Sequence, residues 1–255
     1  MLLRFDATMN GVSFAHLDPQ LMLTDIVELP PEEDVQQARR AIHHGTRITS
    51  RVRRSLSLRM VFAVAECDIA SRARVLDKVA EWAGSGGWLT INSRPGQRLY
   101  VTPETPPSMG SSLRWTSDME MTLTAYERPY WEQLWPTRAV IEESGNIHPV
   151  GTHPAALVEC DVTNTGDGEL TTLTVTCGST HITLEGLSVP AGEHVSIAYT
   201  DDGIMLITAA GASVLANRTA ESSDDLVAVS RQTNAISITA DQTVSAVFSA
   251  RGRYL

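Results

Sequence analysis

Neighbouring carboxylates are the residues of this chain that could do chemistry most directly. Two close carboxyl groups can hydrolyse a glycosidic bond, and oxygen ligands at alternating positions can hold Ca²⁺. The acidic clusters are Glu32-Glu33-Asp34, Glu142-Glu143, Asp201-Asp202 and Asp224-Asp225. None of them has the alternating spacing of a calcium loop, so we interpret them as solvated faces at turns. Because catalytic carboxylates need only be close in space, a glycoside hydrolase stays open as an alternative.

Nucleophiles and metal ligands are sparse. The sequence contains no GxSxG, HExxH, GxxxxGK[ST] or GxGxxG motif and no Cys/His cluster. His43 and His44 are adjacent, without a third ligand nearby, and we interpret them as solvated loop residues. The cysteines, which have no CxxC spacing, are interpreted as small buried thiols: Cys67, Cys160 and Cys177. The sequence therefore predicts no catalytic residue, no metal site and no cofactor.

Arginines are concentrated between residues 39 and 59, where the chain holds seven of them. Guanidinium groups form bidentate pairs with carboxylates and phosphates, so this segment can face a partner subunit or an anionic surface. The simpler interpretation is that the arginines form the solvent face of a strand and loop, balanced by the acidic PPEED segment. If the segment does contact a partner, Arg51, Arg53 and Arg54 are the candidates for pairing between subunits, a role that we favour over contact with DNA.

Aromatic side chains gather at the midpoint of the chain, in YERPYWEQLWP. Four of the 14 aromatic residues lie there: Tyr126, Tyr130, Trp131 and Trp135. Such a cluster can be a sugar-binding platform, a contact with another subunit or a plug between two domains. Beyond residue 154 the chain has no Trp, so an obvious stacking surface for sugars is lacking there. We favour the domain-junction plug, then a subunit contact, and last a sugar platform.

The elements that must position these residues are indicated by the periodicity of the first half. SLSLRMVFAV (55–64) alternates between apolar and polar residues, which predicts a half-buried strand. DIASRARVLDKVAEWA (68–83) repeats at helical spacing, with Asp68 or Ser71 as N-cap, and predicts an α-helix. Further strands are predicted at 88–92, 98–102 and 118–126. Residues 1–140 are therefore expected to form an antiparallel β domain with one packed α-helix.

The chain changes character at residues 141–154. GNIHPVGTHP contains two glycines and two prolines without periodicity, which predicts a linker or crossover. Beyond it, short segments rich in Val, Ile, Leu and Thr recur at regular intervals between turn residues. This pattern is typical of an all-β sandwich, which we expect over residues 155–255. The predicted fold class is mainly β, in two domains.

Formal charge is divided unevenly between the two halves. Residues 1–140 contain 16 Lys plus Arg and 16 Asp plus Glu, whereas residues 141–255 contain 4 and 14. A nucleic-acid-binding protein is expected to carry a net basic face, so sequence-specific nucleic-acid binding is not predicted. Arg4 and Asp6 interrupt the N-terminus where a secretory signal needs an apolar run, and no membrane helix is predicted. We expect synthesis in a cytoplasm.

The order of segments along the chain carries a family resemblance. The first half reads MNGVSF, then an arginine-rich segment leading into SLSLRMVFAV, the helix RARVLDKVAEWA, GGWLTINSRPGQRLYV and a closing strand that runs into YERPYWE. The second half reads PAALVECDV, ITLEGLSVPAGEHVSIAY, DDLVAVSRQTNAISI and VSAVFSARGRYL. Together these segments resemble the distal tail protein (Dit) family of long non-contractile-tailed bacteriophages, whose C-terminal domain is a galectin-like β-sandwich.

The resemblance implies a structural role in the tail tip or baseplate of a virion. Family members form a hexameric ring in which N-terminal belt domains surround a central channel, through which DNA is thought to pass. The implied partners are further copies of the chain, the tail tube protein, the tape-measure protein, a tail-associated hub or lysin protein and receptor-binding proteins. The family has no catalytic residues and no cofactor to carry over. The main alternative is a carbohydrate-binding module for host cell-wall polysaccharide, followed by a cell-wall hydrolase.

Overall fold

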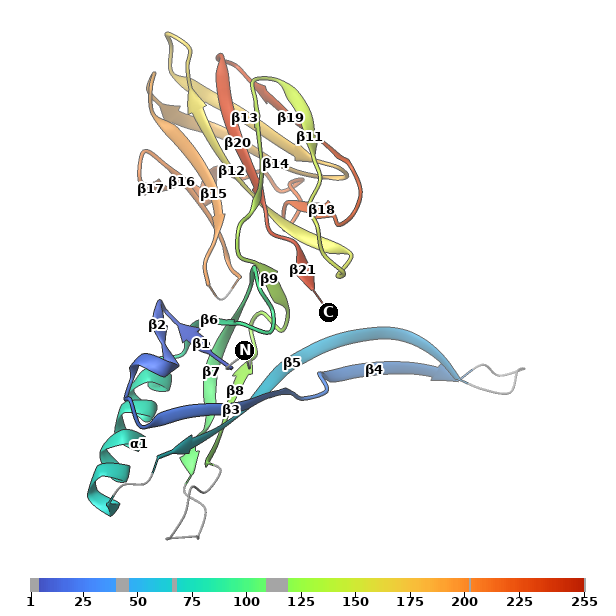
Figure 1. Cartoon of the computed structure of the whole chain (residues 1–255). Coiled ribbons are helices and arrows are strands. Elements are labelled where there is room, and N and C mark those ends of the chain that lie inside the picture. Colours follow the sequence, from blue (N-terminus) through green and yellow to red (C-terminus); the bar gives the residue numbers. More distant parts are fainter. Residues whose placement is uncertain (1–4, 40–45, 66–67, 109–118, 202, 255) are drawn as a thin grey trace. The chain divides into compact units, whose positions relative to one another are not determined.

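The computed structural model describes residues 5–39, 46–65, 68–108, 119–201 and 203–254. The chain divides into two compact units, Met1–Tyr130 (unit 1) and Trp131–Leu255 (unit 2). In the described residues strands predominate and pair antiparallel, and one α-helix is present (Figure 1). The predicted fold class, mainly β with one helix in the first half and a sandwich in the second, is confirmed.

Unit 1 is built on a twisted antiparallel sheet with the strand order β2-β1-β6-β7-β8-β5-β3 (Figure 1). The alternating pattern seen in the sequence buries Leu58, Met60 and Phe62 of one strand on the same face as Met121 and Leu123 of its neighbour. These apolar side chains form the core of unit 1. The strands are β1 (Ala7–Met9), β2 (Val12–Ser13), β3 (Leu21–Glu28), β4 (Glu32–Arg39), β5 (Thr46–Val64), β6 (Gly87–Ile91), β7 (Gln97–Ser108) and β8 (Met119–Ala125).

Helix α1 (Ile69–Gly84) supplies the second layer of unit 1 and packs against β7. Its N-cap is Asp68, whose carboxylate accepts a hydrogen bond from the amide of Ser71 at 2.7 Å and lowers the free energy of the first turn. The ring of Trp82 meets the ring of Phe14 edge-on, with centroids 5.2 Å apart. In the part of the chain that the structure describes, no helix is long and apolar enough to cross a membrane.

A two-stranded ribbon extends from the unit 1 sheet, and its length was not predicted. β5 has 19 residues, and only its second half, from Ser55 onward, carries the apolar alternation. The first half, Thr46–Ser55, pairs with β4 outside the main strand order. We call β4 and Thr46–Ser55 together the β4–β5 ribbon. The residues of the ribbon are mainly polar and include several arginines, so the sequence has no hydrophobic period there that would predict a strand.

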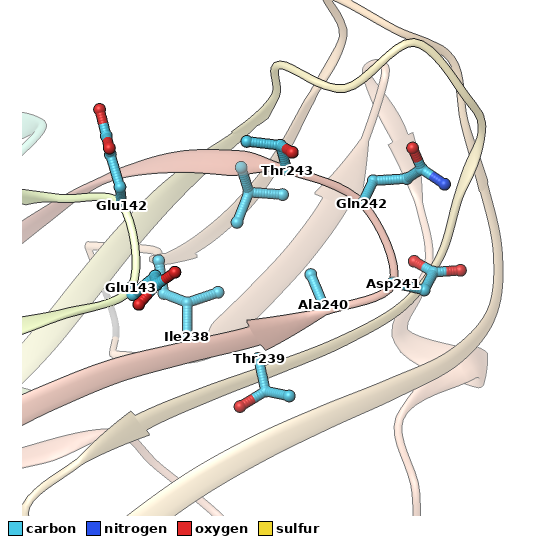
Figure 2. A pocket seen from close by; sticks show the side chains of 9 residues that line it. Glu142, Glu143, Ile238, Thr239, Ala240, Asp241, Gln242 and Thr243 are labelled. Carbon is cyan, nitrogen blue, oxygen red and sulfur yellow. The ribbon is translucent and has the colours of Figure 1, made fainter.

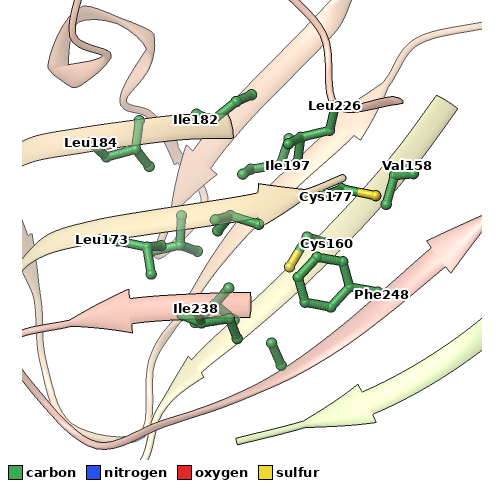
Figure 3. Close-up of a cluster of buried hydrophobic side chains, with 14 of the residues drawn as sticks. Val158, Cys160, Leu173, Cys177, Ile182, Leu184, Ile197, Leu226, Ile238 and Phe248 are labelled. Carbon is green, nitrogen blue, oxygen red and sulfur yellow. The ribbon is translucent and has the colours of Figure 1, made fainter. Parts of the chain in front are cut away.

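Unit 2 is a β-sandwich of two antiparallel sheets. One sheet has the order β10-β20-β12-β15-β16-β17, with β18 paired to β12, and the other has the order β11-β19-β13-β14. Between them lies a continuous apolar core that includes Cys160, Cys177 and Phe248 (Figure 3). A further pair, β9 with β21, joins the first segment of the unit to the last.

The strands of unit 2 are β9 (Trp131–Gln133), β10 (Thr137–Ile141), β11 (Ser144–Ile147), β12 (Ala155–Asn164), β13 (Leu170–Cys177), β14 (Thr180–Val189), β15 (His194–Tyr199), β16 (Met205–Ala209), β17 (Ala212–Ser213), β18 (Val227–Val229), β19 (Asn234–Ala240), β20 (Val244–Ala250) and β21 (Arg253–Tyr254). Two single-turn 3₁₀ helices complete the described elements: η1 (Phe14–His16) in unit 1 and η2 (Leu215–Asn217) in unit 2.

The division between the units differs from the expected boundaries. The sequence placed the end of the first domain at residue 140 and a linker at 141–154, whereas the structure divides the chain after Tyr130. Residues 137–141 and 144–147 form β10 and β11, which pair with β20 and β19 of the sandwich. The glycine that suggested a linker, Gly145, lies inside β11, where a Cβ atom would come within 2.5 Å of the Ile141 side chain. Close packing, not linker flexibility, accounts for this glycine.

Candidate functional site

In the described residues, the acidic pairs included, no group of three or more His, Cys, Asp or Glu side chains is placed to hold a metal ion. Glu142 and Glu143 lie on the β10–β11 turn, across a cavity of about 570 Å³ from Asp241 and Gln242 on the β19–β20 turn (Figure 2). The Asp241 carboxylate accepts hydrogen bonds from the Thr171 hydroxyl and from the amides of Thr171 and Thr172. These bonds, chiefly the one from the hydroxyl, lower the pKa of Asp241. Its role is to hold two strands together.

The other acidic clusters are on surfaces. Asp34 on β4 pairs with Arg54, and Asp224 lies 3.6 Å from Arg218 with its own side chain fully exposed. Asp202, like His43 and His44, lies outside the described residues. Glu32-Glu33-Asp34 lies within strand β4 and not at the expected turn, whereas the side chains of Asp34 and Asp224 are exposed to solvent.

Both described cysteines are free and buried in the core of unit 2, which confirms the prediction for Cys160 and Cys177. Burial raises the pKa of the Cys177 thiol to about 11 and raises that of Cys160 as well. Thiols with such pKa values are poor nucleophiles at neutral pH because the thiolate is scarce. Cys67 lies outside the described residues.

Two arginines of the β4–β5 ribbon, Arg53 and Arg54, have contacts within their own chain. Arg54 pairs with Asp34 at 2.6 Å. The guanidinium of Arg53 donates a hydrogen bond to the Pro129 carbonyl oxygen at 3.3 Å and lies 5.3 Å from the centre of the Tyr130 ring. The Arg51 side chain lies outside the described part of the chain. Pairing of Arg51, Arg53 and Arg54 between subunits stays a prediction, and two of the three already have partners in the same copy.

The four clustered aromatic residues lie on both sides of the division between the units. Tyr126 and Tyr130 belong to unit 1, and Trp131 and Trp135 belong to unit 2. Tyr126 is exposed and Tyr130 contacts Arg53, whereas Trp131 is fully buried and Trp135 is 73% exposed. A buried indole cannot stack on a ligand, so a sugar platform would lack its central ring. The roles as junction plug and as subunit contact remain predictions.

Sequence reasoning missed two arrangements. Arg98 places its guanidinium 3.5 Å above the Trp88 ring, and Tyr100 meets the same ring edge-on. At the C-terminus, Arg253 lies 3.7 Å from Glu132, where β21 pairs with β9. In the sequence, the two arginines of the terminal SARGRYL segment were the only indication of this contact. Their partners could not be identified, because they lie more than a hundred residues earlier in the chain.

The two units, a helix-backed sheet with a ribbon followed by a β-sandwich, together define the class of fold found in phage hub and baseplate proteins. Comparison with solved structures gives particular examples. The Dit protein of phage SPP1, a paradigm of the hub adsorption apparatus in phages that infect Gram-positive bacteria, matches with a TM-score of 0.71 and 11% sequence identity, over 97% of this chain and 98% of that chain. The resemblance to the distal tail protein family is thus confirmed at the level of the fold.

Two structures of a phage baseplate match less closely. A chain of the phage P2 baseplate, in its activated conformation with Ca, has a TM-score of 0.55 at 8% identity, over 99% of this chain and 98% of that one. A chain of the phage p2 baseplate, in its activated conformation with Sr, has a TM-score of 0.55 at 7% identity, over 97% of each chain. No protein-family model matches the sequence, and no curated protein matches it either. At such identities the likeness establishes the fold alone.

Proposed function

We propose that this protein is a structural component of a phage tail tip, a distal tail protein whose copies form a hexameric ring between the tail tube and the baseplate. The observation that carries the proposal is the match to the SPP1 hub protein over 97% of the chain, which takes in both units rather than one common domain. A sandwich alone occurs in many proteins with unrelated functions, whereas this pair of units is far more specific.

The charge distribution supports assembly through unit 1. Residues 1–130 contain 15 Lys plus Arg and 15 Asp plus Glu, whereas residues 131–255 contain 5 and 15. Copies of a neutral unit can come into contact without net repulsion, whereas copies of a unit with ten excess negative charges repel one another. In the proposed ring, unit 1 therefore forms the belt around a channel for DNA, and unit 2 has no part in closing it.

The proposed partners follow from this position in the virion. The belt meets the tail tube protein and the end of the tape-measure protein on one side, and a hub or lysin protein on the other. Receptor-binding proteins attach further out. A structural role also suits the chemistry of the described residues, where the buried thiols are poor nucleophiles and the Asp241 carboxylate holds two strands together.

The oligomeric state of the purified full-length chain tests the proposal. Six copies of a 27.7 kDa chain have a mass of about 166 kDa, and light scattering after size-exclusion chromatography measures this mass directly. We expect the hexamer, with its population rising with protein concentration. A monomer at every protein concentration, even at low ionic strength, would contradict the proposed ring.

A further inference from the structure

The Asn10–Gly11 dipeptide forms the turn between β1 and β2 and has a chemistry that the proposed function does not use. Asn10 is the only one of the six asparagines that is followed by glycine. The backbone φ angles are +50° at Asn10 and +84° at Gly11, as in the type I′ turns that join neighbouring strands. Asn10 is exposed, so water can reach this turn.

An asparagine before glycine can lose its side-chain amide, because no side chain hinders the amide nitrogen that follows. The Gly11 nitrogen gives up its proton and bonds to Cγ of Asn10, and Nδ2 leaves as ammonia. Water then opens the succinimide ring. The product is aspartate when the bond to Cγ breaks and isoaspartate when the bond to the α-carbonyl carbon breaks. The reaction consumes one water, releases one ammonia and needs no oxidant.

The fold holds the reacting side chain in place. Nδ2 of Asn10 donates a hydrogen bond to the Gly86 carbonyl oxygen at 2.9 Å, and Oδ1 accepts one from the Trp88 amide at 3.0 Å. The Asn10 amide also donates to the Trp88 carbonyl oxygen. These bonds join the β1–β2 turn to the turn between α1 and β6, where β1 and β6 are neighbours in the sheet (Figure 1). Ring closure at Cγ therefore requires the side-chain bonds to break first.

Gly87 makes room for the Asn10 side chain. It has a φ of +135°, and a Cβ atom there would lie 2.2 Å from Oδ1 of Asn10. Gly96, in the turn between β6 and β7, also has a positive φ, of +76°, but a Cβ atom there would meet nothing within 4 Å. The two glycines thus form a matched pair, of which only Gly87 contacts Asn10.

We propose that Asn10 is a deamidation site that the folded β1–β2 turn protects and that opening of this turn exposes to reaction. The product carboxylate cannot donate to the Gly86 carbonyl oxygen, so two acceptors face each other where a hydrogen bond stood. It also adds a negative charge to the rim of a crevice that Asn10 lines together with Glu81 and Trp82. The modification therefore weakens the contact that had prevented it and marks chains in which the turn has opened.

Deamidation of the wild-type chain tests the site directly. The folded full-length protein and the same protein in guanidinium chloride are incubated at neutral pH, and peptide mass spectrometry follows the mass gain at each asparagine. In the denaturant we expect Asn10 to react fastest of the six. In the folded protein we expect its rate to be at least about tenfold lower, because two side-chain hydrogen bonds must break first. Equal rates in both states, or no excess over the other asparagines in the denaturant, would overturn the inference.

Alanine substitutions at the two glycines test the contact itself. Gly87→Ala displaces the Asn10 side chain, and we expect it to raise the deamidation rate of Asn10 in the folded protein several-fold. Gly96→Ala also places a side chain at a positive φ in unit 1 and should leave that rate unchanged. Circular dichroism verifies folding, and if Gly87→Ala does not fold, the wild-type comparison still decides. Equal rates in the two folded variants would show that the contact does not protect Asn10.

The variant Asn10→Asp carries one of the two products and tests the consequence. We expect faster amide hydrogen exchange in β1 and β2, because the bond to the Gly86 carbonyl oxygen is lost. Asn146→Asp makes the same change at an exposed position of β11 in unit 2 and is the control. Exchange in Asn10→Asp as slow as in the wild type would contradict the expected weakening of the contact.

Discussion

The Nε atom of Arg253 lies 3.7 Å from Oε1 of Glu132, and this pair fastens the last strand of unit 2 to its first. The Glu132 side chain is only 3% exposed and that of Arg253 16% exposed, so both charges are largely removed from water. Around them, β21 pairs with β9, and Arg251 donates hydrogen bonds to the carbonyl oxygens of Gln133 and Leu134. The sandwich is thus closed by its own C-terminus.

Loss of the Arg253 side chain should destabilise unit 2 strongly. Arg253→Ala leaves a buried carboxylate without this partner, and we expect the free energy of unfolding of unit 2 to fall by about 3 kcal/mol. Hydrogen–deuterium exchange of the β9 and β20 amides measures the change in unit 2 separately from unit 1. Arg138→Ala, which removes an exposed arginine on β10, should change exchange little. Equal effects of the two substitutions would show that the ion pair has no structural role.

The glycine beside Arg253 should tolerate no side chain. A Cβ atom on Gly252 would lie 1.3 Å from the Val150 carbonyl oxygen, so the backbone would have to move. We expect Gly252→Ala to lower the free energy of unfolding of unit 2 by at least about 3 kcal/mol and to expose the amides of β21 and β9. Gly84→Ala is the control, since a Cβ atom there meets nothing within 4 Å. Native-like exchange in Gly252→Ala would refute the close approach.

The thiols of unit 2 should react only after unfolding. Burial raises the pKa of Cys177 to about 11, and Cys160 is also shifted upward, so the reactive thiolate is scarce and inaccessible near pH 8. Iodoacetamide should therefore label both residues at the rate of unfolding, and urea should speed the labelling. Peptide mass spectrometry resolves each site. Rapid labelling of Cys160 or Cys177 in the native protein would contradict their placement in the core.

Acid should weaken the link between β13 and the β19–β20 turn. The pKa of Asp241 is lowered in the folded state, so its carboxylate stabilises unit 2 above its unfolded pKa of about 4, and this contribution is lost as the pH falls through the folded value. Asp241→Asn should therefore melt at a lower temperature than the wild type at pH 6, and the difference should shrink toward pH 3. Asp167→Asn serves as the control. A difference that is constant with pH would exclude this contribution.

The sequence predicted those parts of the fold that have a hydrophobic period. The alternation from Ser55 to Val64 and the helical stripe with its Asp68 cap appear as the second half of β5 and as α1. The β4–β5 ribbon could not be predicted in the same way, because its two strands are mainly polar and rich in arginine and so have no apolar period. Gly145 was misleading because glycine also occurs where a strand is approached closely.

The contacts of the candidate residues were beyond sequence reasoning for a different reason. The Arg53 guanidinium donates a hydrogen bond to the carbonyl oxygen of Pro129, 76 residues further along the chain, and only the folded sheet brings the two together. Composition identified an arginine-rich segment and an aromatic cluster, but it could not show that one aromatic ring contacts one of these arginines. Nor could it show that Trp131 is buried while Trp135 is exposed.

The most direct measurement of the central claim is the location of this protein in the virion. Antibodies raised against the purified chain, labelled with gold and applied to intact phage, can be located by electron microscopy. We predict gold particles at the distal end of the tail, where the tube meets the tip, and none on the head or along the tail shaft. Gold on the capsid or along the tube, or virions that lack the protein altogether, would contradict the assignment to the tail tip.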